Sequence, residues 1–309
     1  MLSLGLDIGG TKIEAVMLNE QGDILFTQRI ATNKTHYAGF LATVTQLIAD
    51  IRSRFDHEFS IGICLPGTED RQSGLFKNSN ILVLNQQPLI SDLETHLQQK
   101  IGWDNDANCF ALSEAIDGAG KSGDSVFGAI LGTGCGGGLT VNKQLLRGHN
   151  GNGGEWGHNP LPGYTPEKDG APATCYCGQT NCTESFISGT GLAQRFSLLT
   201  HAPTSTAAEF FMRVSQQDER ATVYFALYQD QLARAIASVV NIFDPDVIVL
   251  GGGLSQVESI YQGITEKISQ YIFNTSFNTP VKMAQHGDSS GVRGAAWIGR
   301  QVHQNKSTY

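Results

Sequence analysis

The chain has 309 residues, 40% of them hydrophobic and 16% charged, which is enough to bury two cores of ordinary size. Its formal net charge of −8 argues against a broad basic surface for nucleic acid. The sequence shows neither the pattern of a secretory signal nor an apolar run of about 18 residues. We therefore expect a cytoplasmic protein with no membrane span and no nucleic-acid partner.

The first half of the chain alternates strands with helices. The pattern predicts strands at 2–8, 13–18 and 24–30, a helix at 36–55, a strand at 60–65, a helix at 88–99, a strand at 101–105 and a helix at 107–115. The clearest signal is the helical spacing of apolar side chains from Phe40 to Ile51. This half is therefore predicted to be an α/β unit.

The second half opens in the same way. Strands are predicted at 126–131 and 138–141, helices at 191–200, 206–216 and 218–243, strands at 247–250 and 281–284, and a closing helix at 291–301. Each half begins with a strand, a Gly/Thr-rich turn and a strand, and then passes to helices. This order predicts a duplicated α/β unit with a cleft between two lobes.

Three glycine-rich turns follow apolar strands: DIGGTK, LGTGCGGG and LGGGLS. Glycine lets backbone N–H groups approach an anion, so each turn is a candidate phosphate or nucleotide contact, although tight connections also use glycine. None has the spacing of a P-loop or a Rossmann turn. The candidate contacts are Gly9, Gly10, Thr11, Lys12, Gly132, Thr133, Gly134, Gly136, Gly251, Gly252 and Gly253.

Two residues of the first turn carry charge. Asp7 could hold Mg²⁺ directly or through water while the turn binds phosphate oxygens, or it could simply cap the turn. Lys12 could neutralise phosphate charge, or it could be a solvated strand residue.

Asn105 and Asp106 stand where a predicted strand stops and a predicted helix starts. Asp106 could be the N-cap of that helix. Alternatively, it could act as the general base that takes the proton of a substrate hydroxyl attacking a γ-phosphoryl group, with Asn105 fixing that hydroxyl.

Residues 154–184 contain four nitrogen and sulfur donors: His158, Cys175, Cys177 and Cys182. This set is typical of a closed, structural tetrahedral Zn²⁺ site. A disulfide among the cysteines, or free thiols beside a bystander histidine, are the alternatives. In a reducing cytosol, clustered cysteines indicate metal more often than disulfide.

Glu155 and Glu184 flank these donors, and carboxylates suit the vicinal hydroxyls of a sugar. His158 could contact the sugar through one ring nitrogen while the other binds the metal. The alternative is that the two acids are merely solvated.

Taken in order, these motifs resemble the ROK family of repressors, uncharacterised frames and sugar kinases. The resemblance covers essentially the whole chain. DIGGTK and GTGCGGG look like its phosphate turns, GGGLS like its adenosine loop, DNDANC like the segment of its catalytic aspartate, and GEWGH with CYCGQTNCTE like its sugar and zinc signature. Asn181 replaces a usual glycine, and it too tolerates left-handed backbone angles. The long gap before Cys175 makes 159–174 a local elaboration over the pocket.

The resemblance implies a two-lobed α/β fold of the sugar kinase and actin type, with a ribonuclease H-like core, an active-site cleft and a structural zinc loop. We predict a small lobe of 1–107 and 292–309 and a large lobe of 108–291. ATP, Mg²⁺ and Zn²⁺ are the expected cofactors, Asp106 is the expected base, and Gly67 joins Asn105, Glu155, His158 and Glu184 as a substrate contact.

EWGHNPLP and CYCG look most like bacterial zinc-containing fructokinases, which predicts phosphorylation of D-fructose to D-fructose 6-phosphate. The alternatives within the family are N-acetylglucosamine, glucose, mannose or N-acetylmannosamine. A non-catalytic sugar sensor is the alternative of another class. The resemblance also implies a homodimer. Because only six residues precede Asp7, we expect no helix-turn-helix and no DNA-binding role.

Overall fold

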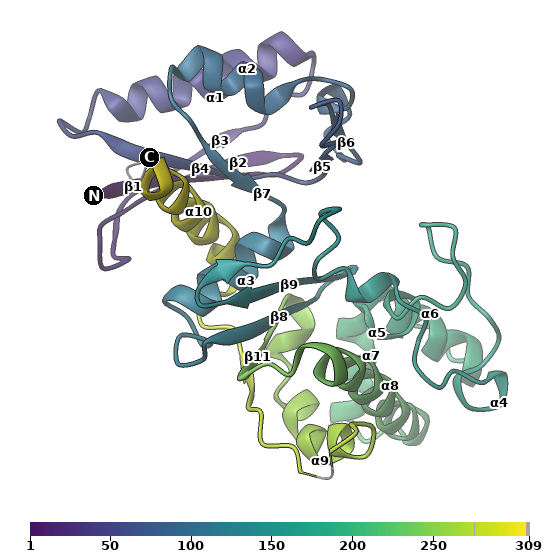
Figure 1. Ribbon diagram of the computed structural model, residues 1–309. Coiled ribbons are helices and arrows are strands. Elements are labelled where there is room, and N and C mark those ends of the chain that lie inside the picture. Colours follow the sequence, from purple (N-terminus) through teal and green to yellow (C-terminus); the bar gives the residue numbers. More distant parts are fainter. Residues whose placement is uncertain (275, 307–309) are drawn as a thin grey trace. The chain divides into compact units, whose positions relative to one another are not determined.

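The computed structural model describes residues 1–274 and 276–306, which form two compact units. Unit 1 comprises residues 1–113 and the chain from residue 288 onward, and unit 2 comprises residues 114–287. The last three residues of the predicted small lobe, 307–309, lie outside the described residues. Each unit is built around its own five-stranded sheet (Figure 1).

The sheet of unit 1 has the strand order β3-β2-β1-β4-β7, with β1 antiparallel to β2 and parallel to β4. Because β4 and β7 are also parallel, the carboxyl ends of β1, β4 and β7 lie at one edge. The strands of unit 1 are β1 (Leu2–Ile8), β2 (Lys12–Leu18), β3 (Ile24–Ala31), β4 (Phe59–Cys64), β5 (Thr68–Glu69), β6 (Phe76–Lys77) and β7 (Gly102–Asp104). Its helices are α1 (Tyr37–Arg52), α2 (Leu89–Leu97), α3 (Asp106–Ile116), within which the chain passes into unit 2, and α10 (Ser290–Lys306).

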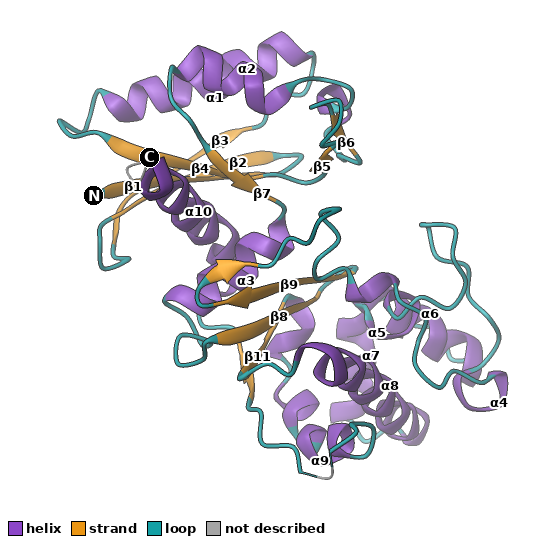
Figure 2. Ribbon diagram, viewed as in Figure 1, coloured by secondary structure: helices purple, strands orange, loops and turns teal. Residues whose placement is uncertain are grey.

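The two faces of this sheet are covered in different ways (Figure 2). On one face, Leu4, Leu6 and Ile8 of β1 pack against apolar side chains of α1 and α2 in a fully buried core. On the other face lies α10, which packs on β1, β4 and β7. Strand residues alternate between faces, so the residues between the core leucines point toward α10.

Three glycines allow α10 to lie unusually close to the sheet. Gly5 pairs with Gly62, and Gly62 pairs with Gly102, so the three form a row across the parallel strands. A Cβ atom on Gly62 would lie 1.7 Å from the carbonyl oxygen of Ala295, and one on Gly5 would lie 2.1 Å from that of Val292. The backbone of the helix therefore occupies space that any side chain would fill.

Unit 2 has the sheet order β10-β9-β8-β11-β12. Its core joins Phe127 and Leu131 of β8 to Tyr228 and Leu232 of the long helix α8 and to aromatic residues of α5, α6 and α7. The strands are β8 (Ser125–Leu131), β9 (Cys135–Val141), β10 (Gln144–Leu145), β11 (Val247–Gly251) and β12 (Val281–Met283). The helices are α4 (Pro166–Asp169), α5 (Glu184–Ile187), α6 (Gly189–Thr200), α7 (Ala207–Ser215), α8 (Glu219–Phe243) and α9 (Ile264–Ser269).

The longer predicted elements are present, with ends shifted by a few residues. The main difference is at β9, which begins at Cys135 inside the predicted glycine turn because Cys135 to Gly138 pair with β8. Short helices such as α5 and α9 were not predicted. Among the described residues, no helix is long and apolar enough to cross a membrane.

The glycine row gives a stability prediction. Gly62→Ala should lower the free energy of unfolding by about 3 kcal/mol, because α10 must move away from β4 to admit the methyl group. Urea unfolding measures the change. The matched control is Gly253→Ala, where an added Cβ meets no atom within 4 Å, and a stability loss as large as that of Gly62→Ala would contradict the explanation.

Candidate functional site

The carboxyl-end edge of the first sheet gathers acidic residues. Asp7 of β1 pairs with Cys64 of β4, and Cys64 pairs with Asp104 of β7, so these three strand ends stand side by side. Asp106 begins α3 two residues later. Burial raises the pKa of Asp7 above its ordinary value, a hydrogen bond with the Cys64 thiol opposes this, and the negative charge of Asp106 adds to it. Asp7 and Asp106 therefore interact within unit 1.

The cap of α3 is Asn105, and this settles an alternative for Asp106. The Asn105 Oδ1 accepts a hydrogen bond of 2.8 Å from the backbone N–H of Asn108, while the helix itself starts at Asp106. Asp106 is exposed, and its Oδ1 accepts a 2.8 Å bond from the N–H of Ala107. Since Asn105 takes the capping role, the exposed Asp106 carboxylate is not needed for it. Its role as general base remains a prediction.

The first glycine turn is closed by a backbone bond of 3.0 Å from the N–H of Gly9 to the carbonyl of Lys12. Lys12 is 59% exposed at its side chain, with its Nζ 3.8 Å from Glu14 Oε2. An exposed, loosely paired ammonium remains available to a phosphate. Gly67, the predicted sugar contact of unit 1, has a φ of +119°, a conformation that favours glycine.

The second and third glycine turns meet at one cavity within unit 2. Its volume is about 640 Å³, and Gly132 and Thr133 of the second turn and Gly253 of the third line it. None of the described residues that line the cavity is charged. The other lining residues are Gly189, Thr190, Ala193, Gln194, Thr204, Ser205, Thr206, Ala207, Ala208, Phe211, Leu254 and Val257. A mostly apolar cavity with a few hydroxyls and one amide suits a heterocyclic base and a ribose.

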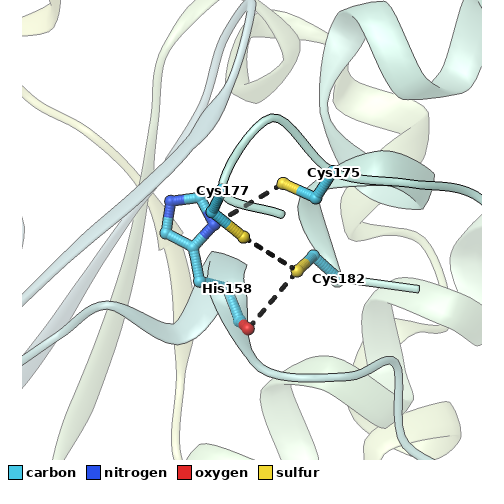
Figure 3. A group of neighbouring side chains, drawn as sticks. All are labelled: His158, Cys175, Cys177 and Cys182. Atoms are coloured by element: carbon cyan, nitrogen blue, oxygen red, sulfur yellow. Dashed lines mark hydrogen bonds between the residues drawn. The ribbon is translucent and has the colours of Figure 1, made fainter. Parts of the chain in front are cut away.

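The four predicted zinc ligands converge in unit 2 (Figure 3). Their donor atoms all lie within 4.8 Å of one another. The Sγ atoms of Cys177 and Cys182 are 3.6 Å apart, and the Cys175 Sγ is 3.7 Å from the His158 Nδ1. Tetrahedral Zn²⁺ with ordinary bond lengths separates two sulfurs by about 3.8 Å and a sulfur from a nitrogen by about 3.6 Å. The donor set and its spacing fit zinc.

We call residues 154–184 the clasp, and two residues with positive φ shape its cysteine turn, residues 175–182. Gly178 has a φ of +87° and Asn181 a φ of +59°, so asparagine does adopt the conformation expected of it. The Asn181 Oδ1 also accepts a 2.9 Å bond from the N–H of Ala173. The turn that brings the thiols together is therefore fixed by backbone conformation and by a side-chain bond.

Glu184 connects the clasp with the second glycine turn. It follows Cys182 by two residues, and its Oε2 accepts a 2.8 Å bond from the backbone N–H of Cys135, while its Oε1 lies 3.9 Å from the Cys175 Sγ. Trp156 makes a second link, since its indole N–H donates to the carbonyl of Gly136 over 2.8 Å. The clasp and the second glycine turn are thus one connected structure.

The second ring nitrogen of His158 does not lie free. In Figure 3 this nitrogen, Nε2, lies on the side of the ring away from the sulfurs. It is 3.1 Å from the Tyr176 hydroxyl. A metal on Nδ1 leaves the proton on Nε2, which then donates to the Tyr176 oxygen. A sugar contact by His158, as predicted, would have to share this hydrogen.

The segment 159–174 is anchored to α8. The carboxylate of Asp169 is completely buried and forms an ion pair with Arg234, and it also accepts a 3.0 Å bond from Gln231. Arg234 further donates to the carbonyl of Pro162 over 2.7 Å. This anchoring holds the long segment between His158 and Cys175 against unit 2.

The predicted site residues therefore fall into two groups. Unit 1 holds Asp7, the first turn, Gly67, Asn105 and Asp106, whereas unit 2 holds the clasp and the other two turns. Within each unit the structure brings predicted residues together. It adds Gln194 and Phe211, which the sequence did not indicate because cavity-lining positions on helices have the same pattern as core positions. It also adds Tyr176, which contacts His158 from a turn that has no periodic pattern.

Two sheets of five strands, glycine turns at strand ends and flanking helices define the α/β fold of sugar kinases. The chain matches the ROK family over residues 3–302 and belongs to it. It is 38% identical to an N-acetyl-D-glucosamine kinase of Haemophilus influenzae, over 94% of this chain and 97% of that one.

Solved structures agree with this fold. A ROK hexokinase from Thermus thermophilus superposes with a TM-score of 0.86 at 26% identity, over 99% of this chain and all of that one. A ROK family glucokinase from Streptomyces griseus, solved with glucose and AMPPNP, gives a TM-score of 0.73 at 27% identity, over 97% of this chain and 100% of that one.

The prediction of fructose as the substrate is wrong. The chain is 36–38% identical to N-acetyl-D-glucosamine kinases over about 95% of its length. EWGHNPLP and CYCG, on which fructose was predicted, both lie in the clasp. Their contacts gather the His and Cys side chains and link the clasp to the second glycine turn, so these residues give no basis for distinguishing fructose from another hexose.

The raised pKa of Asp7 gives a pH-dependent prediction. A carboxyl group whose pKa is higher in the folded state favours folding at low pH, and that stability is lost as pH rises through the folded-state pKa. Asp7→Asn should therefore raise the melting temperature at neutral pH by a few degrees, and the gain should shrink as pH falls toward the ordinary range of aspartate. Thermal unfolding at several pH values measures this, and a gain that grows on acidification would contradict it.

Proposed function

We propose that this protein is an ATP-dependent N-acetyl-D-glucosamine kinase that transfers the γ-phosphoryl group to the 6-hydroxyl of the sugar. The observation that carries the proposal is the 38% identity, over 94% of the chain, to an N-acetyl-D-glucosamine kinase. The acidic edge of unit 1 would provide the general base and hold Mg²⁺, and the cavity and clasp of unit 2 would bind ATP and the sugar.

ATP would place its base and ribose in the uncharged cavity, and backbone N–H groups of the glycine turns would bind its phosphates. Mg²⁺ would be held near Asp7, directly or through water, and would offset the negative charge of the phosphates. Burial raises the pKa of Asp7, and a bound cation would stabilise the ionised carboxylate at this position.

Asp106 would accept the proton of the attacking hydroxyl, since its carboxylate is exposed and its neighbour Asn105 supplies the helix cap. Glu155 and Glu184 would accept hydrogen bonds from sugar hydroxyls. Little covalent chemistry remains for the protein, so positioning and charge neutralisation would provide most of the rate enhancement.

Zinc would be structural. All four positions of a tetrahedral ion would be filled by His158 and the three cysteines, which leaves none open for substrate or water. The bonds of Glu184 and Trp156 then make the metal a support for the second glycine turn.

The substrate is tested by ADP release from ATP and Mg²⁺ with a panel of N-acetylglucosamine, glucose, N-acetylmannosamine, mannose and fructose. We expect the highest kcat/KM for N-acetylglucosamine. A folded, zinc-loaded sample that releases no sugar-dependent ADP would instead support a non-catalytic sugar sensor.

Asp106→Asn should lower kcat by a factor on the order of 10² to 10⁴, the usual contribution of a general base. KM for the sugar should change much less, because the substituted amide keeps the size of the side chain. Asp56→Asn, at another exposed aspartate of unit 1, is the matched control and should keep wild-type kcat. Near-normal kcat in Asp106→Asn would remove this residue from the role.

Metal analysis should find about one Zn²⁺ per chain. Cys177→Ser should lose the metal and lower the melting temperature of unit 2, since the thiolates would no longer be held on one ion. Cys109→Ala, at a buried cysteine of α3, should keep it. Equal zinc content in the two variants would count against the assignment.

A further inference from the structure

Tyr176 is the most exposed aromatic residue of the clasp, and it stands between two of the proposed zinc ligands. Its side chain is 82% exposed, although burial of a tyrosine ring is ordinarily favourable. Its ring meets that of His158 edge to face at 5.3 Å and 83°. Its chain neighbours Cys175 and Cys177 are two of the four clustered donors, so a bound metal would hold its backbone on both sides. The exposed ring would then be ordered and accessible to a ligand.

A metal on the His158 Nδ1 would also fix the hydrogen-bond polarity of the Tyr176 hydroxyl. With a metal on Nδ1, the His158 Nε2 carries the hydrogen and donates to the Tyr176 oxygen, 3.1 Å away. The hydroxyl hydrogen of Tyr176 then points away from His158 and is available to an acceptor. Tyr176 therefore offers an apolar ring and one oriented donor together.

N-Acetylglucosamine differs from glucose only at C2, where an acetamido group replaces a hydroxyl. That group has an apolar methyl and a carbonyl oxygen that accepts hydrogen bonds. Carboxylates such as Glu155 and Glu184 can only accept, so they can bind sugar hydroxyls and the acetamido N–H but not its carbonyl. Glu184 lies beside the clasp, with its Oε1 3.9 Å from the Cys175 Sγ.

We propose that Tyr176 determines specificity for the acetamido group, its ring packing on the methyl and its hydroxyl donating to the carbonyl oxygen. This inference rests on the proposed function. The carboxylates of the clasp bind hydroxyls that glucose and N-acetylglucosamine share. Its tyrosine contacts the acetamido group at C2, the one substituent that differs between them. His158 would support this selection when zinc is bound, because a metal on its Nδ1 leaves the hydrogen on Nε2.

The experiment compares kcat/KM for N-acetylglucosamine and for glucose in wild type, Tyr176→Phe and Tyr176→Ala at equal zinc content. Tyr176→Phe should lower the N-acetylglucosamine to glucose ratio about fivefold, because it removes one neutral hydrogen bond. Tyr176→Ala should lower the ratio by at least tenfold, because the ring contact is also lost. Activity on glucose should stay within about threefold of wild type in both variants.

The matched control is Tyr164→Phe, at another tyrosine of the clasp, whose hydroxyl donates to the carbonyl of Gly170 over 2.8 Å. It should leave the ratio at the wild-type value. A ratio that stays unchanged in both Tyr176 variants, or equal losses for both sugars, would overturn this inference while wild-type preference for N-acetylglucosamine still stands. Absence of that preference in wild type would overturn the proposed function together with it.

Discussion

The close approach of α10 to the sheet of unit 1 is the constraint on which the acidic edge depends. The row of Gly5, Gly62 and Gly102 removes the side chains that would otherwise separate helix and strands. At the start of the same helix, a Cβ on Gly291 would lie only 3.0 Å from Asp7 Oδ2. The helix that closes the fold is therefore also the surface that partly buries Asp7. Because this packing buries Asp7, ionising its carboxylate costs free energy. Side chains at the three glycine positions would push α10 away from the sheet and would expose the acidic edge.

In unit 2, side-chain hydrogen bonds hold the second glycine turn in one conformation. A run of glycines has high conformational entropy when unfolded and gives little packing when folded. Here Glu184 and Trp156 bond to the backbone of that run, and both belong to the clasp. The proposed metal therefore compensates for the freedom that the glycines introduce.

Much of this could be predicted from the sequence, for reasons that particular residues make clear. The core strands and α1 were predictable because Leu4, Leu6 and the apolar stripe from Phe40 to Ile51 have simple periodicities. The convergence of His158 with the three cysteines was predictable because all four lie in one loop. The start of β9 at Cys135 was not, since glycines have no side-chain pattern and the strand exists only through its pairing with β8. Fructose was predicted wrongly because the residues used for it belong to the clasp, and the sequence does not show which side chain meets C2 of the sugar.

The capping bond of Asn105 would orient the substrate hydroxyl in the proposed reaction. The Asn105 Oδ1 accepts from the N–H of Asn108, which leaves one lone pair of that oxygen and both amide hydrogens for a ligand. A substrate hydroxyl that accepts from the Asn105 amide turns its own hydrogen toward another acceptor. Asp106, the next residue along the chain, offers an exposed carboxylate. The bond that begins the helix would thus also hold the side chain that orients the nucleophile.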